Sequence, residues 1–193
     1  MQRRHVLLML AAGTVPAFAA PAIPADEAEL WQRLRGGGLV LLVRHAATDP
    51  GIGDPPGFRL GQCATQRNLS EAGRLDARAL GAAVQDQGVP IGAVWSSRWC
   101  RCLDTARLAF GRVEPLPLLD SAFQVDQAAS SARLAGLRTR LAGLRTAGNL
   151  VMVTHDVNIR ALVNESVAQG EVVVARIAGG GRLEALGRLR IRS

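Results

Sequence analysis

Three short apolar runs, at residues 38–43, 91–95 and 150–154, give way abruptly to polar residues along the chain. Runs of this kind, rich in valine and leucine and without polar alternation, are typical of strands buried on both faces of a parallel sheet. In such sheets, ligands bind just beyond the carboxyl ends of the strands. The polar residues that follow the three runs are therefore expected to lie together at a functional site.

Segments with helical spacing of apolar residues separate these strands, and capping residues and glycines mark their ends. We expect helices over 25–35, from a cap at Ser70 to Gly88, over 98–110, from a cap at Ser130 or Ser131 to Gly148, and from about Asn158 onward. Strands that alternate with helices of this length predict a three-layer α/β/α fold with a mostly parallel central sheet.

Three further strands complete the expected sheet. One is a proline-limited strand at 114–119, and the other two, 171–177 and 182–191, are expected to form a closing hairpin around three glycines. In the last strand the alternation of apolar and charged residues predicts one apolar face, made by Leu183, Ala185, Leu189 and Ile191.

The first nineteen residues have the pattern of an export signal. Arg3 and Arg4 precede an apolar stretch too short to span a bilayer comfortably, and Ala17-Phe18-Ala19 provides a cleavage pattern, so cleavage is expected after Ala19. The paired arginines also fit a twin-arginine signal, and that alternative to an ordinary secretory signal stays open. Residues 20–193 are expected to form a single soluble domain, periplasmic or extracellular, without stable membrane insertion.

Positive charge dominates the composition, with 23 basic residues against 16 acidic ones and a formal net charge of +7. Removing Arg3 and Arg4 with the signal lowers this charge from +7 to +5. Such a balance suits an anionic substrate or an anionic envelope surface. No basic cluster interleaved with aromatic residues indicates a nucleic-acid site. Two histidines in the mature chain are too few for a metal site, and no cofactor is expected.

Three cysteines remain in a compartment that permits disulfides. Cys100 and Cys102 point to nearly opposite sides of an expected helix, so one of them is able to pair with Cys63. Cys100 is the preferred partner, because Cys102 falls among the small residues of the helix face expected to pack in the core. Cys63 and Cys100 are therefore the candidate pair, and the sequence leaves open whether the disulfide forms.

Both histidines of the mature chain follow an expected strand. His45 comes after Arg44 at the end of the first run, and His155 precedes Asp156 at the end of the last; Arg101 lies in the first turn of the helix that follows the middle run. Arginine grips phosphate oxygens in bidentate fashion, and a free helix N-terminus favours an anion. A neutral imidazole is a competent nucleophile toward phosphorus. This combination predicts phosphoryl-transfer chemistry.

Four motifs in order then resemble the histidine phosphatase superfamily, in its phosphoglycerate-mutase-like branch. Residues 43–48 are similar to its Arg-His-Gly signature, with Ala46 in place of the glycine. Residues 67–73 are similar to its Arg-x-Leu-Ser-x-x-Gly element, 96–106 to its Ser-Ser-x-x-x-Arg helix start, and 153–155 to its second-histidine strand. The resemblance covers roughly residues 36–165 and implies a phosphoglycerate-mutase-like fold.

Carried over to this chain, the resemblance implies a role for each matching residue. His45 would be the phosphorylated nucleophile, and Arg44, Arg101 and His155 would complete the phosphate pocket. Arg67 is a candidate substrate contact at the rim, with a surface arginine as the alternative. Thr48 is a candidate phosphate ligand, with a simple turn residue as the alternative.

The proton donor for the leaving group is left open between two residues. Asp120 falls in the window after Arg101 where this branch usually has its acidic donor. Asp156 follows His155 directly, as in the acid-phosphatase branch of the superfamily, where that aspartate donates the proton. Asp120 is the preferred candidate.

Three functions fit these residues. The first is an exported phosphomonoesterase that uses a phosphohistidine intermediate and acts on a small or envelope-associated phosphoester. The second is a phosphomutase of the same fold, which the export signal argues against. The third is a non-catalytic binder of phosphorylated envelope sugars, which has no need of His45 and Arg101.

Overall fold

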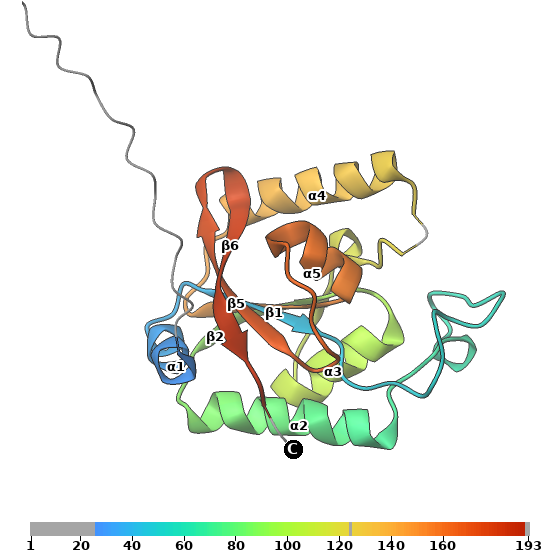
Figure 1. Cartoon of the computed structure of the whole chain (residues 1–193), viewed down its shortest axis with the longest axis horizontal. Coiled ribbons are helices and arrows are strands. Elements are labelled where there is room, and N and C mark those ends of the chain that lie inside the picture. Colours follow the sequence, from blue (N-terminus) through green and yellow to red (C-terminus); the bar gives the residue numbers. More distant parts are fainter. Residues whose placement is uncertain (1–25, 124, 192–193) are drawn as a thin grey trace, which may run out of the picture.

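The computed structural model describes residues 26–123 and 125–191, so the predicted export signal and its cleavage position lie outside the described residues. The described chain folds around one six-stranded sheet with the strand order β3-β2-β4-β1-β5-β6 (Figure 1). Its strands are β1 (Val40–Arg44), β2 (Ile91–Ser96), β3 (Glu114–Pro115), β4 (Asn149–Thr154), β5 (Val172–Ala178) and β6 (Arg182–Leu189).

Helices cover both faces of this sheet, as Figure 1 shows with α4 and α5 on one side and α2 and α3 on the other. The helices are α1 (Glu27–Arg35), α2 (Glu71–Asp86), α3 (Cys100–Phe110), α4 (Gln127–Ala142) and α5 (Asp156–Val163). One core cluster joins α1, α2 and α3 to one face, and a second joins α4 and α5 to the other. The three-layer α/β/α fold predicted from the sequence is therefore confirmed.

The first four strands in the sheet order run parallel, and the last two form the antiparallel hairpin that the sequence predicts. All residues of β4, and all but the last of β1, are buried, in agreement with their unbroken apolar runs. Because β1, β4 and β2 are neighbours and parallel, their carboxyl ends meet at one edge of the sheet.

Two elements differ from the prediction for reasons visible in the chain. The expected strand at 114–119 pairs only over Glu114–Pro115 and continues as a 3-10 turn, Pro117–Leu119, because Pro115 and Pro117 have no N–H to donate to a neighbouring strand. Helix α4 begins before Ser130, because the side chain of Asp126 caps it by accepting a hydrogen bond from the N–H of Ala129 at 2.9 Å.

The prediction that the last strand has a single apolar face is wrong. A bulge shifts the β5–β6 register between Val174 and Ala175, so β6 changes the face it presents along its length. Leu183 packs into the core cluster under α4 and α5, whereas Leu189 packs into the cluster under α1 to α3. Ala185, between them, is exposed.

None of the helices within 26–123 and 125–191 combines the length and the apolar character that crossing a membrane requires.

Candidate active site

The two histidines meet at the shared edge of the sheet. The N–H of His45 donates to the carbonyl of Thr154 at 3.0 Å, which fastens the segment after β1 to the end of β4. The rings of His45 and His155 lie with their centroids 5.5 Å apart. Both side chains are buried, at 3% and 5% exposure, and both line one cavity of about 370 Å³. The structure thus brings the two predicted histidines together.

The imidazole of His45 is held in one tautomer. Its Nδ1 lies 2.9 Å from the carbonyl oxygen of Ala46, and because a carbonyl only accepts, Nδ1 carries the proton. Nε2 therefore keeps a free electron pair. Burial is the main cause that lowers the pKa of His45 from 6.5 to about 3, with contributions from Arg101 and Arg44. At neutral pH this residue is an uncharged imidazole with one nucleophilic nitrogen.

His155 is held by the residues that follow β2. Its Nε2 lies 2.9 Å from the hydroxyl of Ser97 and 3.5 Å from the sulfur of Cys102. Burial lowers the pKa of His155 well below 6.5, and His45 and the nearby arginines add to this effect. The thiol of Cys102 is buried too, and burial raises its pKa to about 12, so it stays protonated and is a poor nucleophile.

These lowered pKa values predict that neither histidine titrates between pH 5 and 8. The ring C–H signals of His45 and His155, assigned with His45→Asn and His155→Gln variants, should keep constant NMR shifts over that range. Because the unfolded chain binds these protons near pH 6.5 and the folded chain does not, the free energy of unfolding should rise with pH up to about 6.5 and then level off. A titration midpoint near 6.5 for His45 would contradict the burial argument.

Two arginines bring positive charge to the cavity. Arg44 donates from Nη1 to the carbonyl of Val167 at 2.6 Å, and Arg101 enters from the first turn of α3. Both line the cavity. Among the residues that the structure describes, their two Nε atoms are the only buried side-chain nitrogens without a hydrogen-bond partner. Unpaired buried donors are costly, so two of them beside a nucleophile indicate an anionic ligand.

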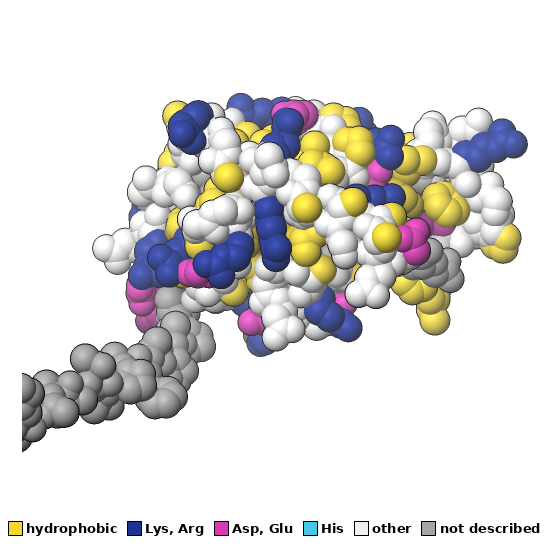
Figure 2. Space-filling model, turned by 90° about the horizontal axis from the view of Figure 1, so that it is seen from above, with side chains coloured by type: hydrophobic (Ala, Val, Ile, Leu, Met, Phe, Trp, Pro, Cys, Tyr) yellow, Lys and Arg dark blue, Asp and Glu magenta, His cyan; other side chains and the backbone are white. Residues whose placement is uncertain are grey.

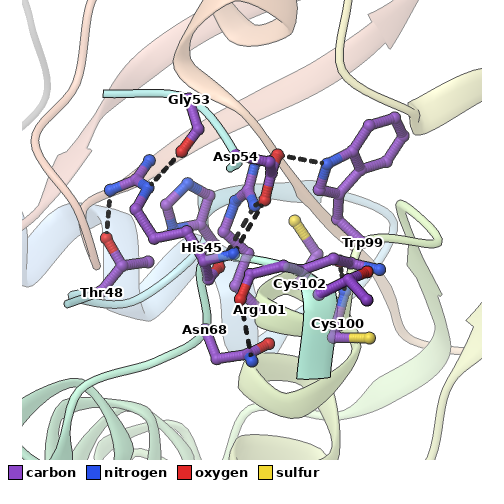
Figure 3. Close-up of polar contacts among 12 residues, drawn as sticks. His45, Thr48, Gly53, Asp54, Asn68, Trp99, Cys100, Arg101 and Cys102 are labelled. Atoms are coloured by element: carbon purple, nitrogen blue, oxygen red, sulfur yellow. Dashed lines mark hydrogen bonds and ion pairs between the residues drawn. The ribbon is translucent and has the colours of Figure 1, made fainter. Parts of the chain in front are cut away.

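Sequence reasoning missed Asp54, which contacts both Arg101 and Trp99. The carboxylate accepts from Arg101 Nη1 at 2.7 Å and Nη2 at 3.2 Å, and from Trp99 Nε1 at 2.8 Å (Figure 3). Burial works to raise its pKa, but the hydrogen bonds from Arg101, the N–H of Arg67 and Trp99 outweigh it and lower the pKa. Asp54 is therefore an anion that orients Arg101. It lies in a loop rich in glycine and proline, where no periodic signal marks it.

Arg67 lines the cavity, as predicted, while Thr48 does not. Arg67 donates from Nε to the carbonyl of Gly53 at 2.8 Å and from Nη1 to the hydroxyl of Thr48 (Figure 3). The threonine thus contacts the arginine instead of the space where a phosphate would bind. Its role in this structure is to position Arg67.

The element 67–73 fixes the chain just after His45. The N–H of Ser70 donates to the carbonyl of Ala47 at 3.1 Å, and the Ser70 hydroxyl caps α2 by accepting from Gly73. A Cβ on Gly73 would lie 1.9 Å from the Ala47 oxygen. Only glycine allows this approach, which explains why the motif needs Gly73.

A disulfide ties the long loop to the helix that carries Arg101. Cys63 and Cys100 are bonded, with their Cα atoms 5.6 Å apart, and Cys102 is free. The N–H of Cys100 also donates to the side-chain oxygen of Gln66 at 3.0 Å. Both contacts attach residues 63–66 next to Arg101, so the loop that supplies Asp54 and Arg67 is anchored at the site.

Both candidate proton donors accept hydrogen bonds from other groups of the protein. Asp120, only 2% exposed, does not line the cavity; it accepts from the N–H of Arg98 at 2.9 Å and from Arg98 Nε at 2.8 Å. Asp156 lines the cavity, but it accepts from the N–H of Val167 at 2.8 Å and from Ser166 at 3.0 Å. Burial acts to raise the pKa of Asp156, but these hydrogen bonds outweigh that effect and lower it. The preference for Asp120 as donor therefore finds no support in its placement.

We expect Asp120→Asn to act on stability and not on proton transfer. An amide is unable to replace the carboxylate toward Arg98, so the free energy of unfolding should fall by about 1–3 kcal/mol in urea titrations. The ratio of kcat/KM for 4-nitrophenyl phosphate to that for phenyl phosphate should stay unchanged. A loss confined to the phenyl ester, whose leaving group is the poorer one, would restore Asp120 as the donor. The same pair of esters tests Asp156→Asn.

Among residues 26–123 and 125–191, no group of three metal-binding side chains lies close enough to hold a metal ion.

Comparison with known proteins relates this site to a family. Residues 40–123, which include His45, Arg67 and Arg101, match the sequence profile of the histidine phosphatase superfamily (branch 1). A search of curated protein sequences finds no significant match.

Solved structures share the fold at low sequence identity. The protein histidine phosphatase SixA, solved with tungstate, is 17% identical with a TM-score of 0.56, over 78% of this chain and 96% of that one. The alpha-ribazole phosphatase of Shigella flexneri is 18% identical with a TM-score of 0.55, over 79% and 95%. The open reading frame Rv3214 product of Mycobacterium tuberculosis is 17% identical with a TM-score of 0.54, over 76% and 94%.

Proposed function

The chain belongs to the histidine phosphatase superfamily, branch 1, and from this premise we propose that it is a phosphomonoesterase in which His45 forms a phosphohistidine intermediate. The observation that carries the proposal is the pairing of a neutral imidazole with two unpartnered guanidinium Nε atoms. The free Nε2 of His45 and the side chains of Arg44 and Arg101 line the same cavity. A phosphate monoester supplies both an electrophilic phosphorus and the oxygens those donors need.

The first step transfers the phosphoryl group to the protein. His45 Nε2 forms a bond to phosphorus while the bond from phosphorus to the ester oxygen breaks, and that oxygen leaves with the electron pair. Arg44 and Arg101 stabilise the charge on the three remaining oxygens. The phosphorylated ring is cationic, and its Nδ1–H remains donated to the carbonyl of Ala46, which supports the intermediate.

The second step releases phosphate. A water oxygen bonds to phosphorus and loses one proton to solvent, the bond to Nε2 breaks, and the electron pair returns to the ring, which regains its neutral form. His155 is an uncharged imidazole beside His45. One nitrogen of such a ring donates a hydrogen bond and the other accepts one, so His155 is able to contact the transferring group in either way. Splitting hydrolysis into two displacements lowers each barrier.

Asp54 limits how Arg101 contacts the phosphate. Its carboxylate occupies Nη1 and Nη2 of Arg101, while Nε stays unpartnered. We infer that Asp54 is a positioning residue, which fixes the plane of the Arg101 guanidinium beside the phosphate. Two arginines and this fixed geometry then hold the phosphoryl group in place for in-line attack.

Export of the protein is part of the proposal. The N-terminal pattern supports it, and the Cys63–Cys100 bond is of the kind that persists in oxidising compartments. An exported phosphatase would act on a small or envelope-associated phosphoester. Fractionation of cells, followed by N-terminal sequencing of the protein, tests this; a mature chain beginning at Ala20 outside the cytoplasm is expected, and an uncleaved cytoplasmic chain would contradict it.

The activity is tested by measuring phosphate release from a panel of phosphomonoesters that includes sugar phosphates. The proposal expects release of inorganic phosphate at a rate independent of added acceptor alcohols. Transfer of phosphate between positions of a sugar, without release, would favour the phosphomutase. Tight binding of phosphosugars without any turnover would favour the non-catalytic binder.

A further inference from the structure

The cavity that contains His45 has apolar lining residues as well as arginines. Ile52, Phe58, Trp99 and Phe123 line it together with the catalytic residues. Ile52 is 95% exposed, Phe58 38% and Phe123 50%, and these are three of the four large hydrophobic side chains that are exposed among the described residues. The fourth, Leu75, lies on α2. Exposed apolar groups gathered at the mouth of a site indicate contact with a ligand.

The position of these residues agrees with the shape of the molecule. Figure 1 places the loop 49–68 as a projection at the right-hand end, and Figure 2 shows hydrophobic side chains gathered at that same end. Because the Cys63–Cys100 bond anchors this loop beside α3, it keeps Ile52 and Phe58, the two apolar lining residues that the loop contributes, at the cavity.

A row of rings connects the nucleophile to these apolar residues. The centroids of His45 and His155 are 5.5 Å apart, those of His155 and Trp99 5.5 Å, and those of Trp99 and Phe58 5.8 Å. The chain has only three tryptophans, four phenylalanines and no tyrosine, so three of its seven aromatic residues line this one cavity. The hydrogen bond from Trp99 to Asp54 fixes the indole in the row. Flat rings pack well against such edge-on and tilted aromatic groups.

The carboxylates of the cavity support the same kind of substrate independently. Within the described part of the chain, Asp54 and Asp156 are the acidic residues that line the cavity, and other groups hold both as anions. Neither is a protonated acid for a departing oxygen. The leaving group must then be stable as an anion, because the cavity supplies no proton to it as it departs. A phenolate, with a conjugate-acid pKa of about 10, meets this requirement far better than an alkoxide, whose conjugate acid is a much weaker acid, close to water.

We propose that the substrate is the phosphate monoester of a small aromatic alcohol, with its ring against Phe58, Trp99 and Phe123 and its phosphate at His45, Arg44 and Arg101. The inference rests on the proposed phosphatase function. The bond from His45 Nε2 to phosphorus forms as the aryl oxygen leaves with its electron pair as a phenolate, which takes a proton from solvent after release. Water then cleaves the phosphohistidine, as described above.

Binding of phosphonates, which are not hydrolysed, tests the apolar contact apart from turnover. Calorimetry on the whole protein should show that naphthylmethylphosphonate binds on the order of tenfold or more tightly than methylphosphonate. Phe58→Ala combined with Phe123→Ala should remove most of this difference, and each single variant part of it. Leu75→Ala, which removes another exposed hydrophobic side chain that does not line the cavity, is the matched control and should keep the full difference.

Octylphosphonate separates an aromatic site from one that is merely apolar. It should bind less tightly than naphthylmethylphosphonate; equal or tighter binding, lost in the same variants, would overturn the aromatic assignment. Equal affinity for naphthylmethylphosphonate and methylphosphonate would overturn the inference altogether. If the aromatic phosphonate binds as expected but no phosphoester is hydrolysed, the phosphatase function fails. If esters are hydrolysed without aromatic preference, only the inference fails.

Discussion

Replacing His45 with asparagine should slow phosphate release by at least about 10³-fold, the largest effect expected of any single substitution. The asparagine side chain is able to donate to the carbonyl of Ala46 as Nδ1–H does, but it has no nucleophilic nitrogen at the position of Nε2. The electrostatic contacts of the pocket remain, so residual turnover should depend on Arg44 and Arg101 alone.

The measurement is kcat/KM for 4-nitrophenyl phosphate, with thermal unfolding to establish that the variant is folded. Leu75→Ala serves as a control for handling, because its exposed side chain lies outside the cavity. A folded His45→Asn protein that retains more than about a tenth of the activity would remove His45 from the reaction.

Arg101→Ala should lower kcat/KM by on the order of a hundredfold or more, because charge-assisted contacts to the transferring phosphoryl group are worth a few kcal/mol. Because an arginine that lines a pocket contributes little to a hydrophobic core, Arg101→Ala would be expected to leave folding unaffected. The structure corrects this expectation. Arg101 and Asp54 form an ion pair whose side chains are only 5% and 6% exposed, so Arg101→Ala leaves a buried carboxylate unpaired and should also destabilise the protein.

The double variant Arg101→Ala with Asp54→Asn separates the two effects. Removing the unpaired charge should restore most of the stability lost in Arg101→Ala, while kcat/KM stays low because the phosphate contact is still missing. Asp54→Asn alone should raise KM modestly by loosening the guanidinium. Recovery of near wild-type activity in the double variant would show that Arg101 acts only through folding.

The rule that ligands bind past the carboxyl ends of parallel strands predicts several of the residues that line the cavity. It predicts that His45 and His155 lie together, because each follows an unbroken apolar run, and in the structure these runs form adjacent strands. Arg101 was found in the same way, from the helix that follows β2. Motif order and spacing then added Arg67, which the structure places in the cavity.

Rules based on strands, helices and motif spacing do not predict the contacts that irregular segments make. Asp54 sits in a loop without periodicity, so its approach to Arg101 depends on tertiary packing and on the Cys63–Cys100 anchor. Asp120 falls in the expected sequence window, but spacing does not give the direction of a side chain, and Arg98 holds its carboxylate outside the cavity. The bulge in β6 reverses its faces, which simple alternation does not predict.

The most direct test of the proposed chemistry is the site of phosphorylation itself. Wild-type protein mixed with a rapidly hydrolysed phosphoester is quenched in alkaline denaturant, which preserves phosphohistidine, and its peptides are analysed by mass spectrometry. Phosphate on His45, labile to acid and absent from the His45→Asn variant, is the predicted result. Phosphate on Ser97 or on a cysteine, with none on His45 during turnover, would contradict it.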